Sequence, residues 1–126
     1  MIVFEASMLL VVAHTLASAC DEARSEKEVP SVKVAVCQIR CVDSDVEGNI
    51  RRITKAVEEA AAKKAEIAAF PETVFIGWVN TDAHKLAEPI PGKFSEIVCR
   101  LAKKHKMMIA IGLTEEVETG IYDSMI

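Results

Sequence analysis

The chain has 126 residues, 51% of them hydrophobic and 27% charged, which excludes a disordered polymer and allows one small folded domain. Aromatic residues make up only 5%, so the core is expected to be mainly aliphatic. With a net charge of −4, the chain lacks the basic surface of a nucleic-acid-binding protein, and no nucleic-acid partner is expected.

The N-terminal segment, residues 1–19, is predicted to be a signal peptide. Its run of apolar and small residues from Ser7 to Ala19 is too short to span a bilayer, and it ends in a small-x-small pattern typical of a cleavage site. Cleavage before Cys20 also fits a bacterial lipoprotein, in which Cys20 carries a lipid anchor. Residues 20–31 are polar and are predicted to form a linker.

These features predict an exported protein, which is periplasmic, extracellular or lipid-anchored. Two observations oppose this interpretation. The segment before the apolar run contains Glu5 and no Lys or Arg, and His14 interrupts the run. The alternative is an added helix or a misassigned start codon, and the protein is then cytoplasmic.

The folded domain is predicted to span residues 32–126 and to begin with a strand at Val32–Ile39, a short, apolar and β-branched run. Ser44 and Glu47 have the spacing of a capping box, which predicts the start of a helix that continues to about Lys64. Apolar residues recur along this helix at three- and four-residue steps and predict one buried stripe: Val46, Ile50, Ile53, Val57, Ala60 and Ala61.

The rest of the domain continues the alternation of strands and helices. A second strand candidate, Glu66–Phe70, ends at Pro71. The elements predicted after it are a loop over 71–80, a short helix over 82–87, a break at 89–92, an amphipathic helix with an apolar face at Phe94, Ile97, Val98, Leu101 and Ala102, a strand over 107–113, a turn over 115–120 and a strand from 121 onward. The order β-α-β-α-β-β predicts an α/β fold with a mainly parallel sheet and a terminal hairpin.

Glu72 is the candidate catalytic residue, because sites on parallel sheets form at the carboxyl ends of strands. Its apolar neighbours are expected to desolvate the carboxylate and make it a better proton acceptor: Phe70, Val74, Phe75, Ile76 and Trp78. The alternative is a loop carboxylate that caps a helix or faces solvent. Trp78 is expected either to line a substrate pocket or to pack in the core. His84 is expected to be exposed, with a substrate-facing position as its alternative.

The cysteines and histidines predict no metal site, because no CxxC pair exists and the three histidines stand far apart. Buried free thiols are expected instead. A disulfide between Cys37 and Cys41 is the alternative.

The segment Phe70-Pro71-Glu72-Thr73, followed by Gly77-Trp78, resembles the region around the catalytic glutamate of the nitrilase superfamily of carbon–nitrogen hydrolases. The resemblance covers residues 32–126, although the family often has Asn where Asp123 stands. Further matching segments occur in the family's order: Val34-Ala35-Val36 with Gln38, Asp45, Asn49-Ile50, Ala65-Glu66, Ile90-Pro91-Gly92, Ile111-Gly112-Leu113 and Tyr122-Asp123-Ser124.

The resemblance implies hydrolysis of non-peptide C–N bonds in a small-molecule amide, carbamoyl compound or nitrile, with no cofactor. In the family a cysteine attacks the substrate, the glutamate takes the thiol proton and later activates water, and a lysine stabilises the intermediate. Glu72 matches the glutamate, whereas the lysine and cysteine motifs are expected beyond Ile126, so this chain alone is predicted to be inactive.

The resemblance also implies the architecture. The family forms an α-β-β-α sandwich of about twice this length, so the chain is expected to be its N-terminal half, truncated, with one sheet face uncovered. The full-length protein is expected to form homo-oligomers.

Two other interpretations remain. One is a non-catalytic α/β module, exported or lipid-anchored, that binds a partner through its open sheet, or a decayed gene fragment. The other, a flavodoxin-like nucleotide domain, is disfavoured because Gly77 and Gly112 belong to no phosphate-binding cluster.

Overall fold

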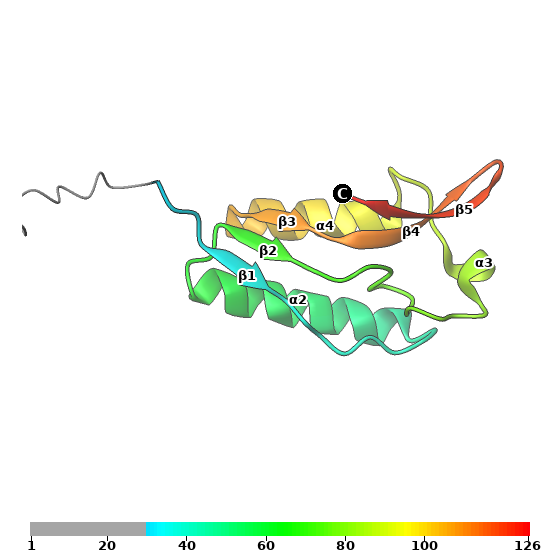
Figure 1. Cartoon of the computed structure of the whole chain (residues 1–126), viewed down its shortest axis with the longest axis horizontal. Coiled ribbons are helices and arrows are strands. Elements are labelled where there is room, and N and C mark those ends of the chain that lie inside the picture. The colour runs from blue at the N-terminus through cyan, green and yellow to red at the C-terminus, as the bar shows by residue number, and fades with distance from the viewer. Residues whose placement is uncertain (1–29) are drawn as a thin grey trace, which may run out of the picture. The chain divides into compact units, whose positions relative to one another are not determined.

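The computed structural model describes residues 30–126, of which Val32–Ile126 form one compact unit (Figure 1). The predicted signal peptide, the lipid-anchor candidate Cys20 and the linker up to residue 29 lie outside the described residues. The elements follow in chain order as β1 (Val34–Val36), α2 (Val46–Ala62), β2 (Ile67–Ala69), α3 (Ala83–Leu86), α4 (Lys93–His105), β3 (Met108–Ala110), β4 (Gly112–Val117) and β5 (Gly120–Met125).

The strands form a parallel sheet followed by a hairpin. β1, β2 and β3 pair in parallel in that order, and Ala35, Ala68 and Ile109 occupy one row across them. β4 and β5 pair in antiparallel. Two backbone hydrogen bonds between Ile111 and Ile126, of 3.0 and 3.1 Å, extend this pairing toward β3. The predicted α/β fold with a parallel sheet and a terminal hairpin is therefore confirmed.

Helices α2 and α4 lie on the same side of the parallel strands (Figure 1). Their apolar stripes turn toward the sheet, because residues three and four apart share one helix face. The core residues that they contribute are Ile53, Val57 and Ala60 from α2, and Phe94, Val98 and Leu101 from α4. Burial of Ala68 and Ile109 in the strands completes this layer, so the two predicted stripes are confirmed.

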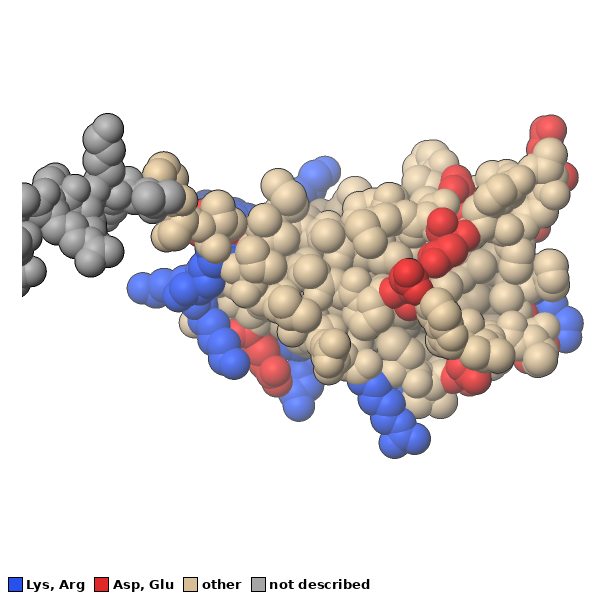
Figure 2. Space-filling view, in the orientation of Figure 1, with Lys and Arg blue, Asp and Glu red and all other residues tan. Residues whose placement is uncertain are grey.

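The opposite face of the sheet is open in the part of the chain that the structure describes. Along β1, Val34 and Val36 are exposed while Ala35 between them is half-buried, as expected for side chains that alternate between two faces. Val36 is 75% exposed and Met108 of β3 is 65% exposed. Figure 2 shows this side as a broad surface with few charged side chains over the parallel strands. The uncovered sheet face implied by the family resemblance is therefore present.

The predicted capping box at the start of α2 is wrong. The cap is Asp45, whose side chain accepts a hydrogen bond from the Gly48 backbone N–H at 3.1 Å. Ser44 instead has a φ of 59°, and its hydroxyl lies 3.1 Å from the Asn80 side-chain oxygen and 3.2 Å from an Asp82 carboxylate oxygen. Ser44 therefore ties the loop before α2 to the loop before α3.

The predicted strand over residues 107–113 is also wrong in its extent. It is divided at Ile111 into β3 and β4, which pair with different neighbours. The predicted turn over 115–120 is shorter than expected, because residues 115–117 belong to β4 and Glu115 pairs with Tyr122. Cross-strand pairing thus extends the hairpin almost to its tip, where Val117 faces Gly120.

Candidate functional site

The candidate site lies at the carboxyl end of β2, between its two parallel neighbours. The Phe70 N–H donates to Ala110 O at 2.8 Å, which keeps the chain in the sheet one residue beyond β2. Gly112 N–H then donates to Pro71 O at 3.3 Å, so the backbone just before Glu72 rests against the junction of β3 and β4. Glu72 is exposed at this edge.

The expected desolvation of Glu72 by its apolar neighbours is wrong. Four of the five neighbours are buried in the core on the other side of the loop: Phe70, Val74, Phe75 and Ile76. The fifth, Trp78, is 68% exposed, so the alternative that it packs in the core is wrong. Because the chain turns into the core immediately after Glu72, these side chains anchor the loop and leave the carboxylate accessible.

A tight turn directly after Glu72 redirects the chain. Thr73 has a φ of 44°, a region in which a β-branched residue is strained. Its carbonyl accepts hydrogen bonds from the N–H groups of Ile76, at 3.2 Å, and Gly77, at 3.0 Å. Gly77 has a φ of 98°, and a side chain there would meet the Asp43 backbone at 2.8 Å. The conformation of the Glu72 loop is thus fixed by its own turn and by the loop after β1.

The backbone at Gly112 packs directly against the backbone at Glu72. A Cβ atom at this position would lie 2.5 Å from Glu72 Cα and 3.0 Å from Pro71 O, and both are backbone atoms that cannot rotate away. Only glycine therefore allows β4 to start this close to the Glu72 loop. In the sequence, Gly112 stands within a family-like segment, and nothing there indicates why this position needs a glycine.

We expect Gly112→Ala to displace the Glu72 loop and to lower the free energy of unfolding by about 1–3 kcal/mol, the usual cost of overpacking. The measurement is urea denaturation together with the amide NMR shifts of residues 71–73. Gly120→Ala is the matched control, because its φ of 143° also disfavours a side chain but no atom lies within 4 Å of the added methyl. Unmoved shifts at residues 71–73 in Gly112→Ala would show that this close approach does not position the loop.

Trp78 and Val79 form an exposed apolar pair a few residues beyond Glu72. His84 is exposed on α3, as predicted. In the same helix turn, hydrogen bonding from Lys85, at 2.9 Å, holds the pKa of Asp82 below its usual value. This ion pair is solvent-exposed and serves the local turn.

The cysteines of the described range are free, so the alternative disulfide between Cys37 and Cys41 is not formed. Cys37 is buried directly after β1 and Cys41 is half-buried, whereas Cys99 is exposed, against the prediction, because it lies away from the buried stripe of α4. Burial, and then the nearby Glu59 carboxylate, raise the pKa of the Cys37 thiol, and burial raises that of Cys41. Such thiols stay protonated at neutral pH and are weak nucleophiles.

Two hollows of the described surface lie away from Glu72. The larger, of about 480 Å³, lies between α2 and α4 over Ile50, Ile97 and Leu101. The smaller, of about 220 Å³, lies beside β1 and α2. Among residues 30–126, no three His, Cys, Asp or Glu side chains gather as a metal site would require, and no helix is long and apolar enough to cross a membrane.

Residues 33–126 match the carbon–nitrogen hydrolase family. The chain is 25% identical over 93 residues to a nitrilase from Paraburkholderia phymatum, covering 63% of this chain and 27% of that protein. It is 33% identical over 72 residues to an omega-amidase from Xenopus laevis, covering 57% of this chain and 26% of that protein. The chain thus spans about a quarter of the length of either relative.

The fold is similar to part of a larger solved structure. A CN-hydrolase superfamily protein from Xanthomonas campestris superposes with a TM-score of 0.69 at 18% identity, over 77% of this chain and 36% of that chain. At this identity the similarity concerns the fold.

Proposed function

Because this chain belongs to the carbon–nitrogen hydrolase family, we propose that the protein of which it forms part hydrolyses non-peptide C–N bonds in a small-molecule amide, carbamoyl compound or nitrile. In this proposal the chain supplies the general base, Glu72. The nucleophilic cysteine and the catalytic lysine come from further residues of a longer polypeptide.

The proposed reaction has two stages. In the first, Glu72 accepts the proton of the cysteine thiol, and the sulfur attacks the substrate carbon. For an amide, the C–N bond then breaks, the leaving nitrogen takes the proton from Glu72, and an acyl-enzyme remains. In the second stage Glu72 removes a proton from water, which attacks the thioester and releases the acid together with the thiol. The lysine ammonium stabilises the negatively charged tetrahedral intermediate in both stages.

The observation that supports this proposal best is the position of Glu72. Its carboxylate is accessible at the carboxyl edge of a parallel sheet, where α/β folds place their sites. The loop that carries it is held by the core residues Val74, Phe75 and Ile76, so the base is presented by a rigid support. Trp78, exposed beyond the turn, is proposed to contact the substrate.

We expect the 126-residue chain alone to show no turnover of simple amides, because one carboxylate cannot form an acyl-enzyme. The measurement is ammonia release from a short aliphatic amide by purified chain, with a complete family member as the positive control. Turnover that disappears after thiol alkylation would contradict this expectation. Reading the gene beyond codon 126 gives a second test, since the proposal needs a downstream lysine and cysteine.

The second candidate function is a binding module, exported or lipid-anchored, that uses the open sheet face. The exposed apolar side chains Val34, Val36 and Met108 favour it, because large exposed apolar patches often mark interaction sites. A stop codon directly after codon 126, together with a stable monomer that keeps this face exposed, would favour the module over the hydrolase.

A further inference from the structure

Asn49 is a fully buried polar residue in the first turns of α2, at 0% exposure. Its side chain uses every hydrogen-bonding position that an amide has. The amide nitrogen donates to Val42 O at 2.8 Å and to Phe75 O at 2.9 Å. The amide oxygen accepts from the Val42 N–H at 3.0 Å and from Arg52 Nη1 at 2.7 Å. A buried amide so completely paired has one orientation.

The groups that Asn49 joins belong to two different loops. Val42 lies in the loop after β1, and Phe75 lies in the loop after β2, three residues beyond Glu72. A direct backbone bond from Ser44 N–H to Ile76 O, of 3.0 Å, runs beside this contact. Asn49 therefore holds together the two loops that leave the carboxyl ends of neighbouring parallel strands.

We infer that Asn49 is a positioning residue for Glu72, acting through the backbone of Phe75 and the turn at Thr73. The segment between Phe75 and Glu72 has little freedom, because Thr73 is in a strained conformation and its carbonyl is bonded to Ile76 and Gly77. Fixing the carbonyl of Phe75 thus fixes the turn that begins at Thr73 and, through it, the direction in which Glu72 leaves the sheet. This inference rests on the function proposed above for Glu72.

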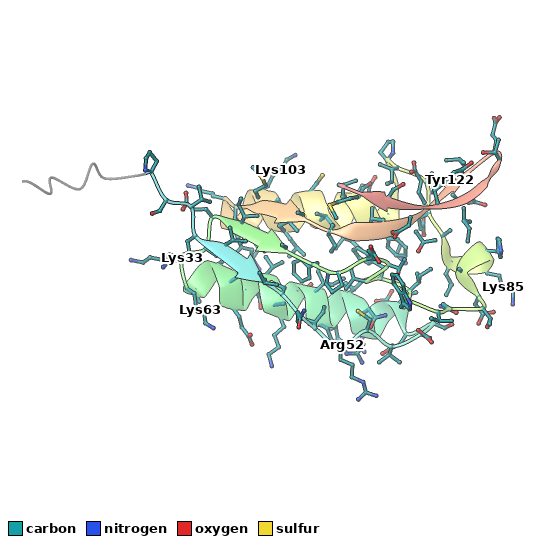
Figure 3. The ribbon with its side chains drawn as sticks, viewed as in Figure 1. Lys33, Arg52, Lys63, Lys85, Lys103 and Tyr122 are labelled. Atoms are coloured by element: carbon teal, nitrogen blue, oxygen red, sulfur yellow. The ribbon has the colours of Figure 1, made fainter. Side chains whose placement is uncertain are left out.

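Arg52 and Asp45 orient the Asn49 side chain. Arg52 donates to Asn49 through one guanidinium nitrogen and to Asp45 Oδ2 through the other, at 3.0 Å (Figure 3 labels Arg52 on α2). With a cation on its oxygen side, the amide turns its nitrogen toward the two loop carbonyls. Hydrogen bonding from Arg52 also holds the pKa of Asp45 below its usual value, so this N-cap carboxylate stays ionised at neutral pH. The helix terminus, the ion pair and the loop contact form one continuous network.

The test separates positioning from general stability through three variants. Asn49→Ala removes all four bonds, and Asn49→Asp keeps the acceptor for Arg52 but loses both bonds to the loop carbonyls. Val57→Ala is the matched control, because Val57 is equally buried in the same helix but makes none of these contacts. If Asn49→Ala fails to fold, the same measurements are made on Asn49→Asp.

Hydrogen exchange of the 126-residue chain gives the first measurement. In both Asn49 variants the amides of Ser44, Ile76 and Gly77 are expected to exchange roughly five- to tenfold faster, as for one lost hydrogen bond, while sheet amides such as Phe70 keep their rates. Val57→Ala should instead raise the exchange rates of loop amides and sheet amides to a similar extent. Loop amides that keep their protection in both Asn49 variants would overturn the inference.

Kinetics of the full-length protein give the second measurement. The Asn49 variants are expected to lose about 100-fold in kcat with little change in KM, as a misplaced catalytic group does, while Val57→Ala keeps kcat below its melting temperature. Retention of kcat in both folded Asn49 variants would overturn the inference. Unimpaired turnover in Glu72→Gln would instead reject the proposed function, and the exchange experiment would still decide whether Asn49 holds the loop.

Discussion

We expect Glu72→Gln to lower the proposed C–N hydrolysis by the full-length protein about 10²- to 10⁴-fold, which is the usual contribution of a general base. Glutamine has the same shape but cannot accept a proton. The loss affects both stages of the proposed reaction, because the same carboxylate deprotonates the thiol and then the water. The measurement is steady-state ammonia release together with single-turnover formation of the acyl-enzyme.

The fold is expected to tolerate this substitution, because Glu72 is exposed and its carboxylate accepts no hydrogen bond within the described residues. Glu58→Gln is a matched control, since Glu58 is an exposed carboxylate on α2. Its one ion pair within residues 30–126, with Lys104 at 3.2 Å, is solvent-exposed and contributes little. Both variants should melt close to the wild type, and only Glu72→Gln should lose turnover. Near-normal activity in Glu72→Gln would refute the assignment of the base.

Much of the fold can be predicted from the chain because its signals are local. The apolar stripes of α2 and α4 follow the helix period, and the short β-branched and aliphatic runs mark the parallel strands. The predictions are wrong where contacts between residues distant in the chain determine the ends of strands and helices. Ile111 divides the third strand because it pairs with Ile126, and Asp45 caps α2 where the residue spacing favours Ser44.

The candidate site divides in the same way. The place of Glu72 after a strand is a local feature, and the sequence predicts it. The environment of Glu72 depends on where the following side chains point. The turn at Thr73 sends Val74, Phe75 and Ile76 into the core, and nothing in the local sequence indicates that direction.

The residues that support the site are the hardest to predict. Gly112 is 40 residues beyond Glu72 in the chain. Its role follows from a backbone approach so close that an added Cβ would lie 2.5 Å from Glu72 Cα, which only the folded structure shows. Asn49 reads as an ordinary polar residue of an amphipathic helix, yet it is fully buried because two loop carbonyls and Arg52 satisfy it. Complete hydrogen bonding is a tertiary property, so the pattern of apolar residues carries no trace of it.

Phe75→Ala is expected to lower the free energy of unfolding by about 3–5 kcal/mol, a large part of the stability of a small domain. Phe75 is 1% exposed, and its ring stacks on Phe94 of α4 with the centroids 4.4 Å apart and the planes inclined by 16°. Removing the ring leaves a cavity where the Glu72 loop meets the helix layer, and it removes an aromatic contact that adds to the buried area.

Trp78→Ala in the same loop distinguishes burial from aromatic character. Trp78 is the larger side chain but is 68% exposed, so its removal is expected to change the free energy of unfolding by less than about 0.5 kcal/mol. Urea denaturation of both variants and the wild type measures the difference. Equal losses would mean that Phe75 does not anchor the loop through the core. A large loss for Phe75→Ala alone would show that buried side chains directly after Glu72 stabilise the loop that carries it. The sequence predicted that these same side chains surround the carboxylate.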